Sequence, residues 1–175
     1  MITHRAAGLL ALLATLLFGI PTTSADQPEL FRAVMIGVNV APEPVSTQAS
    51  ARGTAVLTGR VLTVHGSFHG LSGNLRDLIE TPEDPGIHIH PGASGETAPY
   101  LYGLAAELAP DGRSGIFHGR FELTAGEVRK LREGRIYLDI HTSRHEDGEV
   151  RGQLLPLAGH SQGTVNEGLG RVLED

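Results

Sequence analysis

The sequence predicts an all-β fold, an antiparallel Greek-key β-sandwich or barrel with one short helix. Apolar and polar residues alternate with a period of two over several short segments, as expected for strands with one buried face. The 23 glycines and 10 prolines divide these segments at short intervals, which is typical of sandwiches and barrels. We therefore predict one β-sandwich domain over residues 26–157.

The predicted strands follow the alternating segments in order. In the fourth strand, we expect Ile87 and Ile89 to point inward and His88 and His90 to point outward. We expect a turn at 59–60 between the second and third strands, and a turn at 146–148 before the last strand. The predicted strands are residues 31–40, 53–58, 61–68, 86–90, 100–108, 116–123, 135–142 and 149–157.

One short helix is predicted over residues 125–133. Thr124 and Glu127 have the spacing of a capping box, in which each side chain accepts a hydrogen bond from the other residue's backbone amide. Val128 and Leu131 give the helix one apolar side, and Gly134 supplies a left-handed end.

Both ends of the chain differ in composition from the predicted domain. Residues 1–25 combine Arg5, an apolar run over 6–20 and small residues at the predicted cleavage site, which is the pattern of a signal peptide. The apolar run is shorter than the roughly 20 residues that span a bilayer. We expect export to the periplasm or the cell exterior, and a flexible C-terminal tail over the polar, Gly-rich residues 158–175.

Composition excludes several classes of protein. With 14 Lys and Arg against 20 Asp and Glu, the chain has a formal net charge of −6, which disfavours binding to nucleic acid or anionic membranes. No later apolar run is long enough for a membrane span. The absence of cysteine excludes disulfides, thiol catalysis, iron–sulfur clusters and blue copper. No phosphate-binding loop or metalloprotease motif is present either, so the sequence favours a protein without catalytic activity.

The nine histidines include a group that predicts a metal site. His88 and His90 alternate along one strand, so their imidazoles can bind one ion, and His141 joins them if its strand lies alongside. Nitrogen ligands suit Cu(II), Zn(II) or Ni(II), and the intrinsic order of affinities favours copper. Alternatively, these histidines are solvated surface residues. The candidates for a fourth ligand are His65, His69, His118 and His145.

Arg151 lies on the last predicted strand between Glu149 and Gln153. As a fixed positive charge it can steer an anion towards the histidines. Alternatively, it forms a structural ion pair with Glu149 or Asp139.

Five segments together resemble the chordin-type (CHRD) domain family, which includes exported bacterial proteins with a single domain. The resemblance extends from about residue 31 to residue 157. Its most specific parts are the His-x-His strand and His141-Thr142 together with the Gly-Glu-x-Arg-Gly-Gln ending. It implies a β-sandwich and, as one alternative, a non-catalytic extracellular module that binds a protein partner. The segments are 68–73, 87–92, 123–134, 137–142 and 149–154.

A more remote resemblance is to the copper–zinc superoxide dismutases. It implies that His88, His90 and His141 are copper ligands and that Arg151 guides an anionic substrate. The chain lacks the histidine-rich zinc loop and the disulfide of that family, so the resemblance concerns fold and metal site. The leading hypothesis is an exported CHRD protein that binds copper for storage, delivery or redox chemistry. The alternatives are the protein-binding module and a dismutase-like copper enzyme without the zinc subsite.

Overall fold

The computed structural model describes residues 27–76 and 86–157. The predicted signal peptide, residues 1–25, and the predicted tail, residues 158–175, lie outside the described residues.

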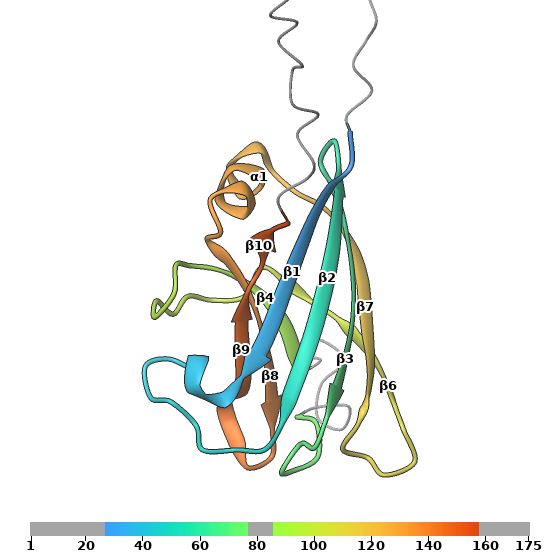
Figure 1. Cartoon of the computed structure of the whole chain (residues 1–175), viewed down its shortest axis with the longest axis vertical. Helices are drawn as coiled ribbons and strands as arrows, with labels where there is room; N and C mark the ends of the chain where they lie inside the picture. The colour runs from blue at the N-terminus through green and yellow to red at the C-terminus, as the bar shows by residue number, and fades with distance from the viewer. Residues whose placement is uncertain (1–26, 77–85, 158–175) are drawn as a thin grey trace, which may run out of the picture.

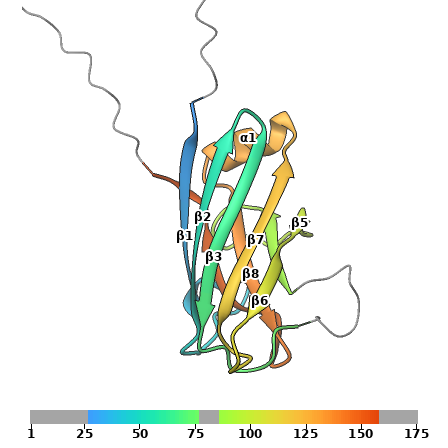
Figure 2. The ribbon, with the colours of Figure 1, turned by 90° about the vertical axis from the view of Figure 1, so that its right-hand side faces the viewer.

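The described residues form one antiparallel β-sheet that curves into a nearly closed barrel with one α-helix, which confirms the predicted fold class. The strand order is β5-β4-β8-β9-β1-β2-β3-β7-β6, and β10 pairs with β1. The chain therefore crosses from the wall of β1, β2, β3, β7 and β6 to the wall of β5, β4, β8 and β9 after β3, returns between β5 and β6, and crosses again between β7 and β8 (Figures 1 and 2). The elements are β1 Glu29–Ile36, η1 Gly37–Asn39, β2 Ser50–Thr58, β3 Val61–His69, β4 Ile87–Pro91, β5 Tyr102–Gly103, β6 Ala105–Leu108, β7 Gly115–Glu122, α1 Ala125–Arg132, β8 Ile136–Thr142, β9 His145–Gln153 and β10 Leu155–Pro156.

Apolar side chains from both walls fill the barrel. The inward residues of each strand alternate with exposed ones, as in β1, where Phe31, Ala33 and Met35 are buried. From β4, Ile87 and Ile89 point into this core as predicted. The histidines of β4 therefore lie on the opposite face of the strand.

The helix is confirmed, together with its capping box. The Thr124 side chain accepts a hydrogen bond from the backbone N–H of Glu127, and the Glu127 carboxylate accepts one from that of Thr124. Val128 and Leu131 are buried, and α1 covers one end of the barrel (Figure 1). No helix among the described residues has the length and apolar character needed to cross a membrane.

The predicted strand over residues 100–108 is wrong as a single element. Its two halves pair with different strands, since β5 pairs with β4 and β6 pairs with β7. Only the buried Leu104 separates β5 from β6, so the two ends of the sheet meet there. This change of partner brings the barrel close to full closure.

The structure also differs from the prediction at the first strand, the last hairpin and the last strand. The first strand ends at Ile36 and not at residue 40, because the chain turns at Gly37, where a Cβ would lie 2.2 Å from the Val45 carbonyl oxygen. The last hairpin does not turn at 146–148. Thr142 pairs with His145 across a two-residue turn, and Gly148 takes a φ of 115° within β9, where the pairing register shifts. The predicted strand over 149–157 is likewise divided between β9 and β10.

Candidate metal centre

The pairing of β4 with β8 brings four potential ligands together. His88 and His90 lie on one face of β4, and Asp139 and His141 lie on the same face of β8, with His88 directly opposite Asp139. One ligand atom from each of the four lies within 4.8 Å of every other. The predicted group of three histidines is therefore assembled, and these four residues could hold a metal ion.

The Asp139 carboxylate is the common neighbour of the three imidazoles. Its Oδ1 atom lies 3.2 Å from Nε2 of His90 and 3.2 Å from Nε2 of His141. The same oxygen lies 3.6 Å from Nδ1 of His88. The site is thus a mixed nitrogen and oxygen set, and not the all-nitrogen set that the histidine pattern indicated.

The outer face of β4 is covered by other residues. His88 and His90 lie on this face, opposite the core, as predicted, but they are only 4% and 7% exposed, so the alternative that they are solvated surface residues is wrong. The Tyr100 ring stacks on His88 at 4.5 Å between ring centroids, and the Tyr137 ring stacks on His90 at 4.7 Å. The two tyrosines therefore form aromatic walls beside the imidazoles.

Backbone carbonyls determine which ring nitrogens face the site. Nδ1 of His90 lies 2.7 Å from the Ala98 carbonyl oxygen, and Nδ1 of His141 lies 2.7 Å from that of Glu146. A carbonyl oxygen can only accept, so each Nδ1 carries the hydrogen and donates it. In the neutral ring, Nε2 then has a free lone pair directed at Asp139, as a metal ligand requires.

Three buried atoms of the site are not satisfied by hydrogen bonds. Nε2 of His90, Nε2 of His141 and Oδ1 of Asp139 have no hydrogen-bond partner of acceptable geometry, although the distances between them are short. Buried polar atoms are rarely left in this state. A cation that accepts all three lone pairs would satisfy them together.

The pKa values of Asp139 and His141 show that the site holds a negatively charged carboxylate. Burial alone would raise the pKa of Asp139, but interactions with His141, His88 and His90 hold that pKa far below its usual value. Burial would lower the pKa of His141, but the Asp139 carboxylate outweighs it and raises that pKa. The carboxylate is therefore ionised in the folded protein and attracts positive charge.

A pocket of about 380 Å³ opens beside three of the four ligands. His90, Asp139 and His141 line it, together with the basic side chains of Arg76 and Arg151. An ion or a small molecule can therefore reach the ligands from this side.

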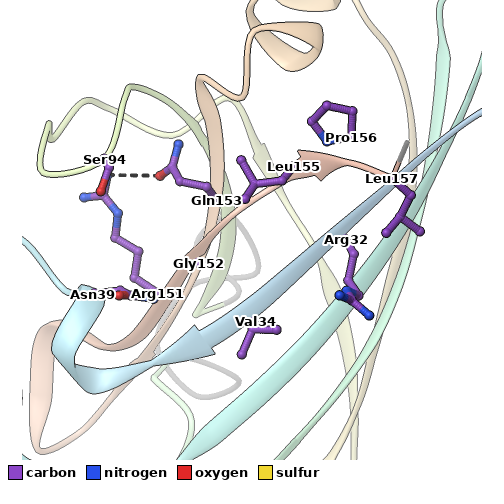
Figure 3. Close-up of a pocket in the computed structure, with 10 residues that line it drawn as sticks. All are labelled: Arg32, Val34, Asn39, Ser94, Arg151, Gly152, Gln153, Leu155, Pro156 and Leu157. Atoms are coloured by element: carbon purple, nitrogen blue, oxygen red, sulfur yellow. Dashed lines mark hydrogen bonds between the residues drawn. The ribbon is translucent and has the colours of Figure 1, made fainter. Parts of the chain in front are cut away.

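Arg151 is buried, but none of its contacts is the ion pair that the sequence suggested. Its guanidinium carbon lies 3.5 Å from the centre of the Tyr137 ring, and its Nη2 donates to the Ala93 carbonyl oxygen at 3.0 Å. Within the described residues, no salt bridge joins Arg151 to Glu149 or Asp139. The side chain extends from β9 towards Ser94 and Gln153, and it also lines an outer pocket of about 420 Å³ (Figure 3).

Glu149 has a structural role, because its buried carboxylate links several parts of the chain. Its carboxylate is completely buried and accepts hydrogen bonds from the hydroxyls of Thr47 and Thr142 and from the backbone N–H of Ser72. It therefore joins β9 to β8 and to two loops, next to the ligand His141.

The four histidines suggested as a fourth ligand lie outside this cluster. His65 and His118 face each other on β3 and β7, His69 lies 3.0 Å from the Ser50 hydroxyl, and His145 opens β9. Asp139 takes the fourth position in the cluster. The sequence carried a signal for it, because Asp139 precedes His141 by two residues on the same face of a strand, as His88 precedes His90.

Comparison with known proteins identifies one family. The family model described as the CHRD domain matches residues 31–154. No curated protein and no solved structure matches the chain.

Proposed function

The chain belongs to the CHRD domain family, and we propose that it binds one transition-metal ion at His88, His90, Asp139 and His141. The observation that carries the proposal is the cluster of buried ligand atoms within 4.8 Å of one another. The hydrogen bonds from Nδ1 of His90 and His141 to carbonyl oxygens support it, because metal-binding histidines are usually oriented in this way.

We propose copper as the physiological ion. Three imidazole nitrogens and one carboxylate oxygen suit Cu(II), Zn(II) and Ni(II), and Cu(II) has the highest intrinsic affinity of the three. The pocket beside the ligands supports a role in storage or delivery, since it provides a path for the ion to enter and leave. The same opening would admit a small reactant to a redox reaction.

Export is part of the proposal. We propose that residues 1–25 are a signal peptide, that residues 26–157 are the exported domain and that residues 158–175 are a flexible tail. The protein then acts in the periplasm or outside the cell.

The test is a titration of the purified protein with Cu(II) in competition with a chelator of known affinity. We expect one tightly bound ion in the wild type. His90→Ala should weaken that binding at least 100-fold, because a ligand atom is lost. Asp139→Asn should weaken it at least 10-fold, because the amide keeps the shape of the side chain but carries no charge.

His69→Ala is the matched control, since it removes an exposed histidine that lies outside the cluster. It should bind copper like the wild type. Equal copper affinity in wild type and His90→Ala would refute the proposed function. Parallel titrations with Zn(II) and Ni(II) test the choice of metal, and tighter binding of either would contradict copper.

A further inference from the structure

We propose a second, independent metal-binding site on the outer surface of the barrel, formed by His65 of β3 and His118 of β7. The two residues are direct partners across this antiparallel pair of strands. Directly opposed residues have Cβ atoms about 4.5–5.5 Å apart, so the backbone alone holds the two side chains next to each other. Their ring centroids are 6.3 Å apart and the ring planes differ by 29°.

This separation is within the range found in the inner cluster. There, the ring centroids of the three histidines are 4.9 to 6.5 Å apart. Two imidazoles that bind one ion at ~2.0–2.1 Å place their ring centres roughly 4.5–6.5 Å apart. The spacing of the His65 and His118 rings is therefore compatible with a shared ion.

A carboxylate completes the arrangement. Glu107 of β6 lies on the same outer face, because Ala105, two residues before it, pairs with His118. Its Oε1 atom lies 3.6 Å from Nε2 of His118. Three adjacent strands thus present two nitrogens and one oxygen, which again suits Cu(II), Zn(II) or Ni(II).

Exposure distinguishes this surface pair from the inner cluster. The side chains of His118 and Glu107 are 44% and 70% exposed, and His65 is exposed as well. Water can complete the coordination shell, so an ion binds directly from solvent, but three mobile side chains must be ordered in the process. We therefore expect weaker binding here than at the four buried ligands. The surface pair shares no residue with the inner cluster, so it extends the proposed function and does not depend on it.

The test separates the two sites by using the full chain with the inner cluster disabled. His90→Ala should retain one weakly bound Cu(II) ion in equilibrium dialysis. Adding His65→Ala or His118→Ala to it should weaken that remaining binding at least tenfold. Adding His69→Ala, which removes another exposed histidine of β3, should change it less than twofold. Equal binding in the His90→Ala and the His90→Ala/His118→Ala variants would overturn the proposal.

A positional measurement uses NMR spectroscopy of the His90→Ala variant, in which the inner cluster no longer competes strongly for Cu(II). Added Cu(II) should broaden the amide signals of residues 63–67 and 117–119 before those of other strands. Loss of this broadening in the His90→Ala/His118→Ala variant would support the surface pair. Broadening that begins elsewhere, or that persists in the double variant, would overturn it.

Discussion

Asp139 contributes the carboxylate around which three imidazoles gather. Its Oδ1 atom lies 3.2 to 3.6 Å from a ring nitrogen of each histidine, and its side chain is only 9% exposed. A buried carboxylate is costly unless positive charge compensates it. The carboxylate that attracts a metal ion therefore also carries an energetic cost of burial, which positive charge beside it reduces.

Arg151 provides a prediction at the scale of a single residue. Arg151→Ala should change Cu(II) affinity less than about twofold, because a guanidinium does not bind metal ions. It should weaken the binding of azide to the copper-loaded protein several-fold, because it removes a fixed positive charge from the pocket beside the ligands. Titration of the copper absorption band with azide measures the effect.

The control for Arg151 is Arg32→Ala, which removes an arginine that lines the outer pocket and is not part of the lining of the pocket beside the ligands. Azide binding should be unchanged in it. If Arg151→Ala lowers only the melting temperature and leaves azide binding unchanged, the arginine acts through its contact with Tyr137, which is worth about 0.5–2 kcal/mol.

At the scale of elements, the β8–β9 hairpin carries two ligands and is held in place by Glu149. Burial would raise the pKa of Glu149, but hydrogen bonds from Thr47, Thr142 and Ser72 outweigh burial and lower it. A group with a lowered pKa in the folded state stabilises that state fully above its unfolded pKa. This contribution is lost as the pH falls through the folded pKa.

We therefore predict a pH-dependent effect of Glu149→Gln. At pH 7 the free energy of unfolding should fall by about 1–3 kcal/mol, because a buried charged acceptor is replaced by an amide with fewer acceptor sites. Below about pH 4.5 the difference from the wild type should shrink, since the wild-type carboxylate also loses its advantage there. Urea unfolding at pH 7, 5 and 3.5 measures both effects.

Glu43→Gln, at an exposed position in the loop before β2, serves as the control and should change stability by less than about 0.5 kcal/mol. A Glu149→Gln variant with the same deficit at every pH would contradict the proposed origin of the effect.

At the scale of the whole molecule, the ligands come from strands that are far apart in the sequence. His88 and His90 precede Asp139 and His141 by about 50 residues, and the barrel wall joins them through β4 and β8. The cluster therefore exists only in the folded chain. Any ion that binds it stabilises folding by linkage.

This linkage predicts a thermal effect. Free Cu(II) at 100 times its dissociation constant should stabilise the protein by about 2.7 kcal/mol. For a chain of this size that corresponds to an increase in melting temperature of about 5–10 °C. Differential scanning calorimetry with and without the ion measures it, and a chelator should reverse it. A melting temperature unaffected by saturating Cu(II) would contradict binding to the folded state.

The sequence alone determined the alternating strands, the helix with its capping box, and the histidines of the inner cluster. Each is a local pattern: two-residue spacing on a strand, three-residue spacing at a helix start, and residue types that bind metals. The family resemblance rested on the same local segments and is confirmed by the match over residues 31–154. Such features can be predicted from the sequence because residues close together in the chain largely determine them.

The tertiary structure alone decided what covers each face and which strands become neighbours. The polar face of β4 is buried because Tyr100 and Tyr137 stack on its histidines. The local sequence pattern of β4 does not predict that these tyrosines cover it. Asp139 became the fourth member of the cluster because β8 pairs with β4 in a register that places it opposite His88. His65 and His118 meet on the other wall for the same reason. Long-range pairing brings together residues that are distant in the sequence, so its outcome depends on the packing of the whole barrel.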